Sequence, residues 1–285
     1  MQYDPIKRSL GNVFNRSAAM RKLFYGLLDL LLLRAWHVHK ELRVWSSEFG
    51  VNPKPQTPNS QPLNILDAGS GYGQYSFWMW KHFKSANILA VDVKDEQVAD
   101  CNRFFQNIGA ANVKFEVGDL TKFSKPDTYD LVLSVDVMEH ILEDELVFRN
   151  FNSSLKKGGM LLISTPSDQG GSDVPPNPLK GEEDKGRSFI EEHVRDGYNI
   201  KDIEDKLNRA GFSKVEARYA YGTPGKISWR LSMKYPIQML GVSKLFFIIL
   251  PFYYLIAYPI SFVLNYFDVS MKHTTGTGLI VKAWK

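Results

Sequence analysis

The stretch that decides the fold is Asn64-Ile65-Leu66-Asp67-Ala68-Gly69-Ser70-Gly71-Tyr72-Gly73. An apolar strand runs here into a carboxylate and then into a turn with three alternating glycines. Glycine is favoured where the backbone takes a positive φ or where a ligand must approach the main chain closely. The pattern therefore predicts a loop between a strand and a helix that binds a flat, polar, nucleotide-containing cofactor.

The spacing of the glycines narrows the choice of ligand. The dinucleotide fingerprint is G-x-G-x-x-G, in which the third glycine lies beside a pyrophosphate. Here that third position is Gln74. Asp67 stands two residues before the first glycine, where a carboxylate disfavours a pyrophosphate and favours a cationic ligand such as an ammonium or a sulfonium. The alternative is a glycine-rich turn of an ordinary α/β protein.

The run from Asp67 to Gly73 resembles the D/E-x-G-x-G-x-G motif of class I S-adenosylmethionine-dependent methyltransferases. Within that family the chain is similar to the type 11 and ubiquinone-biosynthesis O-methyltransferases. The resemblance implies S-adenosylmethionine as the cofactor, bound in part by Gly69, Ser70, Gly71 and Gly73. It also implies an α/β fold: a doubly wound, Rossmann-like sheet of seven strands that is parallel except for an antiparallel last strand.

Further segments follow the order that such a sheet requires. Apolar strands are predicted over 88–93, 113–117 and 129–136, and residues 155–166 read as a helix end, a glycine turn and a fifth strand. Ligands of doubly wound sheets bind at the carboxyl ends of the strands, so the acids that close the first four strands are expected to converge on one crevice. By the resemblance, one of these acids accepts from the ribose hydroxyls and another from the adenine amino group. Besides the loop, the expected cofactor residues are Asp67, Asp92, Val93, Asp119, Leu120 and Asp136. For Asp92, the alternative is the N-cap of the following helix.

Composition and charge suggest how the 285 residues are organised. The single cysteine, Cys101, forms no internal disulfide and is compatible with a cytoplasmic location. We expect an N-terminal amphipathic helical segment (1–50), a proline-rich linker (51–61), the methyltransferase domain (62–221 and 271–285) and a hydrophobic helical insertion (222–270). Basic residues outnumber acidic ones at both ends of the chain, which are also its most apolar parts. This favours peripheral contact with the inner face of a membrane over binding of nucleic acid. The sequence does not indicate an oligomeric state.

Apolar side chains in the N-terminal segment recur every three or four residues from Met20 to Trp45, which predicts one face of a long helix. Its apolar core, 23–33, is too short to span a bilayer and contains Asp29. Two roles stay open for this helix: a lid that packs on the methyltransferase domain, or a contact with the membrane surface.

The insertion before the last strand contains 23 residues without charge, 245–267. Strands are predicted on either side of it, over 214–221 and 278–284, and they must pair in one sheet. A single membrane span would place them on opposite sides of a bilayer, and two spans need about 40 apolar residues. Pro251 and Pro259 are expected to divide the stretch into shorter helices or a re-entrant hairpin. We therefore expect a hydrophobic cap that lies in the lipid interface or covers an apolar substrate.

Two histidines are candidates for catalysis. His140 follows the fourth strand, and His193 lies in Glu191-Glu192-His193-Val194-Arg195, which is predicted to start the helix after the fifth-strand loop. Either imidazole could accept a proton from the methyl acceptor. The alternative for His140 is a turn histidine bonded to the backbone. Asp136, Glu139, His140 and His193 also resemble the divalent-metal ligands of some methyltransferases, but the E-H pair is common in metal-free members, so no metal is predicted.

The sequence as a whole predicts an S-adenosylmethionine-dependent methyltransferase that acts on an apolar or lipid-linked small molecule, with oxygen as the expected acceptor atom. A second possibility is a non-catalytic membrane adaptor that retains the fold. A nicotinamide-dependent dehydrogenase is disfavoured by Gln74 and by the lack of a recognisable hydride-transfer pair.

Overall fold

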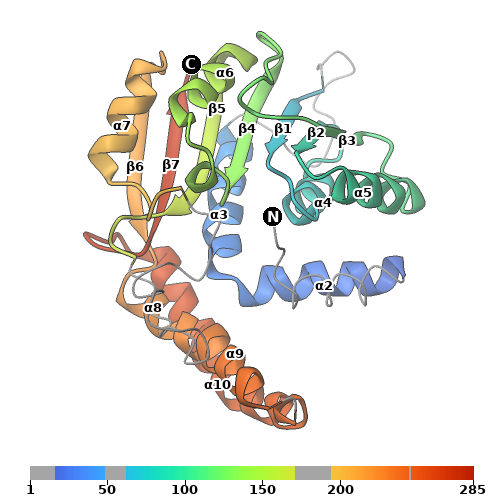
Figure 1. Cartoon of the computed structure of the whole chain (residues 1–285), viewed down its shortest axis with the longest axis vertical. Coiled ribbons are helices and arrows are strands. Elements are labelled where there is room, and N and C mark those ends of the chain that lie inside the picture. The colour runs from blue at the N-terminus through green and yellow to red at the C-terminus, as the bar shows by residue number, and fades with distance from the viewer. Residues whose placement is uncertain (1–16, 49–61, 171–193, 244) are drawn as a thin grey trace.

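A seven-stranded sheet forms the centre of the protein (Figure 1). The computed structural model describes residues 17–48, 62–170, 194–243 and 245–285. The strand order is β3-β2-β1-β4-β5-β7-β6, and β7 runs antiparallel between β5 and β6. The strands are β1 (Asn64–Ala68), β2 (Asn87–Asp92), β3 (Val113–Val117), β4 (Tyr129–Val135), β5 (Leu155–Pro166), β6 (Lys214–Ala220) and β7 (Gly278–Trp284). The predicted doubly wound fold is confirmed.

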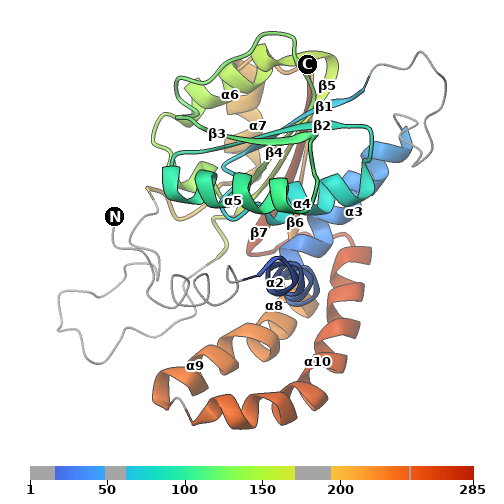
Figure 2. The ribbon, with the colours of Figure 1, turned by 90° about the vertical axis from the view of Figure 1, so that its right-hand side faces the viewer.

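The central strands are mainly apolar because both faces of the sheet are covered. Ile65 and Leu66 of β1 are fully buried, as are the three residues 131–133 of β4. Helices α3 (Leu33–Glu48), α4 (Gln74–His82) and α5 (Asp95–Asn107) cover one face, and α6 (Asp144–Ser154) and α7 (Ile200–Arg209) cover the other (Figure 2). Parallel order places the carboxyl ends of β1 to β5 on one edge, where the site is found.

The N-terminal segment forms two helices instead of the predicted single long one. α2 (Ala18–Leu31) ends at Leu32, whose φ of −87° and ψ of 111° are extended, and α3 then runs in a different direction (Figure 1). The apolar periodicity continues through the break because both helices bury a face on the same domain. Tyr25 of α2 and Trp45 of α3 both belong to the core on that side of the sheet.

The insertion forms a helical hairpin that projects away from the sheet (Figures 1 and 2). Its first leg consists of α8 (Thr223–Trp229), the π-helical turn η3 (Arg230–Lys234) and α9 (Tyr235–Val242). Its second leg is α10 (Phe246–Ser270), a single helix that contains both Pro251 and Pro259. The expectation that these prolines divide the stretch was wrong: α10 bends (Figure 2), but it does not end at either of them.

The hairpin leaves from β6 and returns to β7, and these two strands pair over their full length. The expected pairing on either side of the insertion is therefore confirmed. Among the described residues, α10 is the one helix that is long and apolar enough to cross a membrane.

Candidate active site

The glycine loop between β1 and α4 has the backbone that its sequence predicts. Gly69, Gly71 and Gly73 all take positive φ, of 81°, 52° and 77°. A Cβ on Gly69 would collide with Val137, whereas a Cβ on Gly71 would project into open space. Gly69 thus serves packing, and Gly71 presents bare main chain to the surface where a ligand would lie.

Three N–H groups of the loop, those of Gly69, Ser70 and Gly71, donate to protein acceptors. The amides of Gly69 and Ser70 donate to the carbonyl of Val91, at 2.8 and 3.1 Å, and the amide of Gly71 donates to Asp92 Oδ2 at 2.8 Å. A pyrophosphate site needs such donors pointing at the ligand, so these three amides are not available to a dinucleotide. Ser70 Oγ, in contrast, is buried without a hydrogen-bond partner in the described part of the chain.

Asp67 is buried at the end of β1, and its expected contact with the cofactor stays a prediction. Its side chain is 2% exposed and lies beneath the loop, where it accepts a hydrogen bond from Ser76 Oγ at 2.6 Å. Burial, reinforced by the charge of Asp92, raises the pKa of Asp67 to about 6. The committed N–H groups of the loop disfavour an anionic ligand, and the role of the Asp67 carboxylate toward a cation stays a prediction.

The acids of the second and third strands lie near the same edge of the sheet. Asp92 also accepts from the amide of Lys94 at 3.0 Å, so it shapes the turn before α5 as well as the loop. Val93 is 57% exposed, whereas Leu120 is buried. Asp119 is half exposed, and hydrogen bonds from the hydroxyl and amide of Thr121 lower its pKa.

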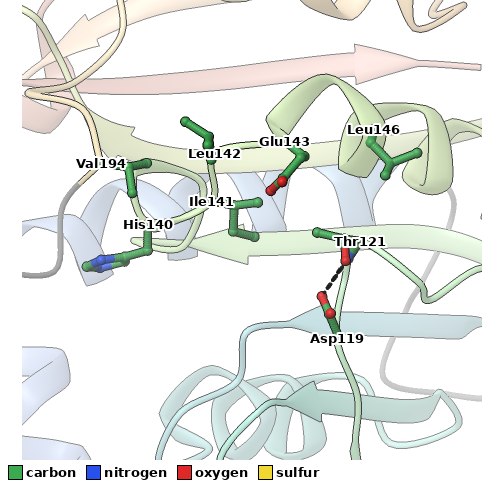
Figure 3. A pocket seen from close by; sticks show the side chains of 8 residues that line it. All are labelled: Asp119, Thr121, His140, Ile141, Leu142, Glu143, Leu146 and Val194. Carbon is green, nitrogen blue, oxygen red and sulfur yellow. Dashed lines mark hydrogen bonds between the residues drawn. The ribbon is translucent and has the colours of Figure 1, made fainter. Parts of the chain in front are cut away.

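A shallow cleft of about 500 Å³ connects Asp119 with the turn after β4 (Figure 3). It is lined by Asp119, Thr121, His140, Ile141, Leu142, Glu143, Leu146 and Val194. The imidazole of His140 and the carboxylate of Asp119 lie apart in it (Figure 3). The cleft therefore offers a proton acceptor away from the acid that the resemblance assigns to adenine.

In the part of the chain that the structure describes, no three His, Cys, Asp or Glu residues are grouped to hold a metal ion. Glu139 is buried, accepts from Thr165 Oγ1 at 3.1 Å, and has a pKa raised by burial. His193 lies outside the described residues.

Asp136 takes part in a second, smaller depression at the ends of β4 to β7. Its φ of 52° is unusual for a residue other than glycine, and such backbone conformations cluster at functional sites. Its carboxylate forms an ion pair with Arg34, which reaches across from α3. Arg34 was missed from the sequence, because an ion pair between residues so far apart has no local signature. Asp119 and Asp136 thus line separate hollows.

Helix α2 clamps the outer side of the glycine loop. Arg21 Nη2 donates to the carbonyl of Tyr72 at 3.0 Å, and the hydroxyl of Tyr25 donates to the same carbonyl. Gln74, the residue that breaks the dinucleotide fingerprint, donates to Asp29 at 2.7 Å, and burial raises the pKa of Asp29 to about 6. These contacts favour the lid role for the N-terminal segment.

The base of the hairpin is tied to α3 by one buried carboxylate. Asp268, near the end of α10, is fully buried, and its Oδ1 lies 2.8 Å from His37 Nε2. It also accepts from the amides of Tyr221 and Gly225, at 3.1 and 2.9 Å. Asp268 therefore joins α3, the end of β6 and the start of the hairpin, and His37 lies three positions along α3 from Arg34.

Comparison with known proteins identifies the central region. Residues 59–209 match the family described as "Methyltransferase domain". Phosphoethanolamine N-methyltransferase of Triticum aestivum is 30% identical over 154 residues, which are 54% of this chain and 28% of that protein. Malonyl-[acyl-carrier protein] O-methyltransferase 2 of Ilyobacter polytropus is 30% identical over 108 residues, 38% of this chain and 40% of that protein. The chain thus spans well under half of either relative.

A solved structure of similar fold is phosphoethanolamine N-methyltransferase 2 of Haemonchus contortus in complex with S-adenosyl-L-methionine. The TM-score is 0.55 at 19% identity, and the match covers 85% of this chain and 52% of that one. At this identity the likeness concerns the fold.

Proposed function

This chain belongs to the class I S-adenosylmethionine-dependent methyltransferases, and we propose that it transfers a methyl group to an oxygen atom of an apolar or lipid-linked small molecule. The observation that carries the proposal is the glycine loop, which combines open main chain at Gly71 with amides committed to Val91 and Asp92. Such a loop suits a nucleoside without a diphosphate. The cofactor supplies an activated methyl on a sulfonium, a good leaving group.

The residues available to hold the cofactor are those of the loop and the neighbouring strand ends. Asp92 would accept from the ribose hydroxyls, and Asp119 from the adenine amino group. Asp136 would receive the cationic amino-acid end, which requires it to release Arg34. The freed guanidinium would then face the depression that Asp136 and Tyr221 both line. Arg34 would thus pair with Asp136 before the cofactor binds and release it when the cofactor binds.

The protein's remaining tasks are to align the acceptor, to exclude water and to remove a proton. His140, which lines the same cleft as Asp119, is the proposed proton acceptor among the described residues; His193 keeps its proposed role from the sequence. An apolar acceptor is supported by position: the depression at Asp136 is walled by the start of β7 and the end of β6, the two strands from which the hydrophobic hairpin emerges.

Nitrogen is the second candidate for the acceptor atom. The wheat relative is named as an N-methyltransferase and the bacterial one as an O-methyltransferase, so the comparisons admit both chemistries. A neutral amine needs no general base once it has lost its proton, whereas a hydroxyl needs one during transfer. The dependence of the rate on His140 therefore separates the two.

The test is a methylation assay with isotopically labelled S-adenosylmethionine and fractionated lipid extracts. We expect label in an apolar product that is heavier than its precursor by one methylene group. Asp202→Asn, on the exposed surface of α7, serves as the control variant, and His140→Ala as the test variant. Binding of the cofactor with no transfer to any fraction would favour the non-catalytic adaptor instead.

A further inference from the structure

The hairpin exposes many large apolar side chains, whose contact with water is unfavourable. Large side chains project outward from α10 along its whole length, and Phe252, Leu255 and Ile256 are 67%, 72% and 73% exposed. The same holds at its start and end; the other half-exposed or more exposed members are Leu245, Phe247, Ile248, Ile249, Ile260, Val263, Tyr266, Phe267 and Met271. Contiguous apolar patches of this extent mark sites of interaction with other molecules or with membranes.

The inner side of α10 carries small and polar residues. Ala257, Ser261, Asn265 and Asp268 are the buried positions of its second half, spaced three or four apart. They pack on α8, where Ser228 Oγ donates to Asn265 Oδ1 at 2.6 Å. A helix on the surface of a soluble domain shows the reverse arrangement, apolar inside and polar outside. Small and hydrogen-bonded residues at the contact, with apolar residues around it, are typical of helices surrounded by lipid.

The hairpin also satisfies its irregular backbone internally. The π-helical turn η3 leaves carbonyls without their usual helical partners, and two tyrosines of α10 reach across to this segment. Tyr253 donates to the carbonyl of Leu231 at 2.7 Å, and Tyr254 donates to that of Ser232 at 2.8 Å. Backbone groups that enter an apolar environment must be paired in this way.

Apart from one buried carboxylate, the charged side chains of the hairpin are all basic. Its first leg carries Lys226, Arg230 and Lys234, and the sequence adds Lys244, which lies outside the described residues, between the two legs. The one carboxylate of residues 222–271 is Asp268, which is fully buried. A cationic leg beside an apolar one complements an anionic lipid headgroup layer over hydrocarbon.

We propose that the α8–α10 hairpin embeds in one leaflet of an anionic lipid bilayer without crossing it. The pairing of β6 with β7 requires the chain to return to the side from which it left, and the bend of α10 turns its first part across the end of the molecule (Figure 2). The bilayer is the occupant that accounts for both the outward apolar side chains and the basic leg.

The experiment is flotation of the full-length protein with vesicles of phosphatidylcholine alone or with phosphatidylserine. The triple variant Phe252→Ser, Leu255→Ser, Ile256→Ser removes apolar side chains that touch solvent, and we expect its partition into both vesicle types to fall about a hundredfold. The variant Lys226→Gln, Arg230→Gln, Lys234→Gln should lose about tenfold or more on the anionic vesicles and little on the neutral ones.

The matched control is Leu23→Ser with Leu27→Ser, which changes exposed apolar residues of α2. Loss of flotation in this control with none in the hairpin triple variant would overturn the proposal. A second result would also overturn it: the unchanged chain binds no vesicles, and the triple variant has a different molecular mass by light scattering. In that case a second copy of the chain would cover the apolar surface of the hairpin. Calorimetric binding of S-adenosylmethionine should be unchanged in all variants, which separates this result from the proposed methyl transfer.

Discussion

Replacing Asp67 by Asn is expected to stabilise the protein in neutral solution and not in acid. Asp67 is buried, and its pKa in the folded protein is raised from 3.8 to about 6. A raised pKa means that the charged carboxylate is less favourable in the folded than in the unfolded state. Two pKa units correspond to about 3 kcal/mol. The free energy of unfolding of the native chain should therefore fall by up to this amount as pH rises from about 4 to about 6.

Asparagine carries no charge and can still accept from Ser76 Oγ. Near pH 4 the free energy of unfolding of the variant should thus equal that of the native chain apart from a constant offset. Above pH 6 it should be larger by about 2 to 3 kcal/mol. The assay is urea unfolding followed by circular dichroism at pH values from 4 to 8, with Asp202→Asn as a control expected to stay within about 0.5 kcal/mol at each pH. A pH-independent difference between Asp67→Asn and the native chain would refute the reasoning, since it would mean that burial does not penalise this charge.

Three further perturbations test other parts of the account. Asp268→Ala should lower the free energy of unfolding by about 3 kcal/mol or more, because it leaves the amides of Tyr221 and Gly225 and the His37 imidazole without their acceptor; a loss under about 1 kcal/mol in urea unfolding would mean that Asp268 does not hold the base of the hairpin on α3. Gly71→Val places a branched side chain at a positive φ on the open face of the loop, and isothermal calorimetry should find S-adenosylmethionine binding at least about tenfold weaker. His140→Ala should lower kcat about a hundredfold with unchanged cofactor affinity if oxygen is the acceptor, whereas an unchanged kcat would point to nitrogen.

The sheet was predictable because its information is local. Each of the first four strands is a short, largely apolar run that ends at or just before a glycine or an acid, and β3 has the bounds that the sequence predicts, 113–117. The carboxyl ends of these strands fix the edge on which the site lies. A pattern of this kind places a residue along a strand, but the partners of its side chain depend on the fold, which is why the hydrogen bond of Asp67 with Ser76 was not predicted.

What the sequence could not predict depends on contacts between distant elements. The break at Leu32 interrupts no periodicity, since α2 and α3 both bury apolar faces on the domain. The ion pair of Arg34 with Asp136 joins α3 to the end of β4. Pro251 and Pro259 were expected to end a helix, but α10 continues through both of them and bends. Helices tolerate proline in this way where neighbouring groups satisfy the freed backbone carbonyls.

The most direct measurement of the central claim is calorimetric titration of the purified chain with S-adenosylmethionine, S-adenosylhomocysteine and NAD. The loop geometry predicts saturable binding of the two adenosyl compounds and none of NAD, with binding lost or weakened in Gly71→Val. Binding of NAD, or the failure of both adenosyl compounds to bind, would contradict it.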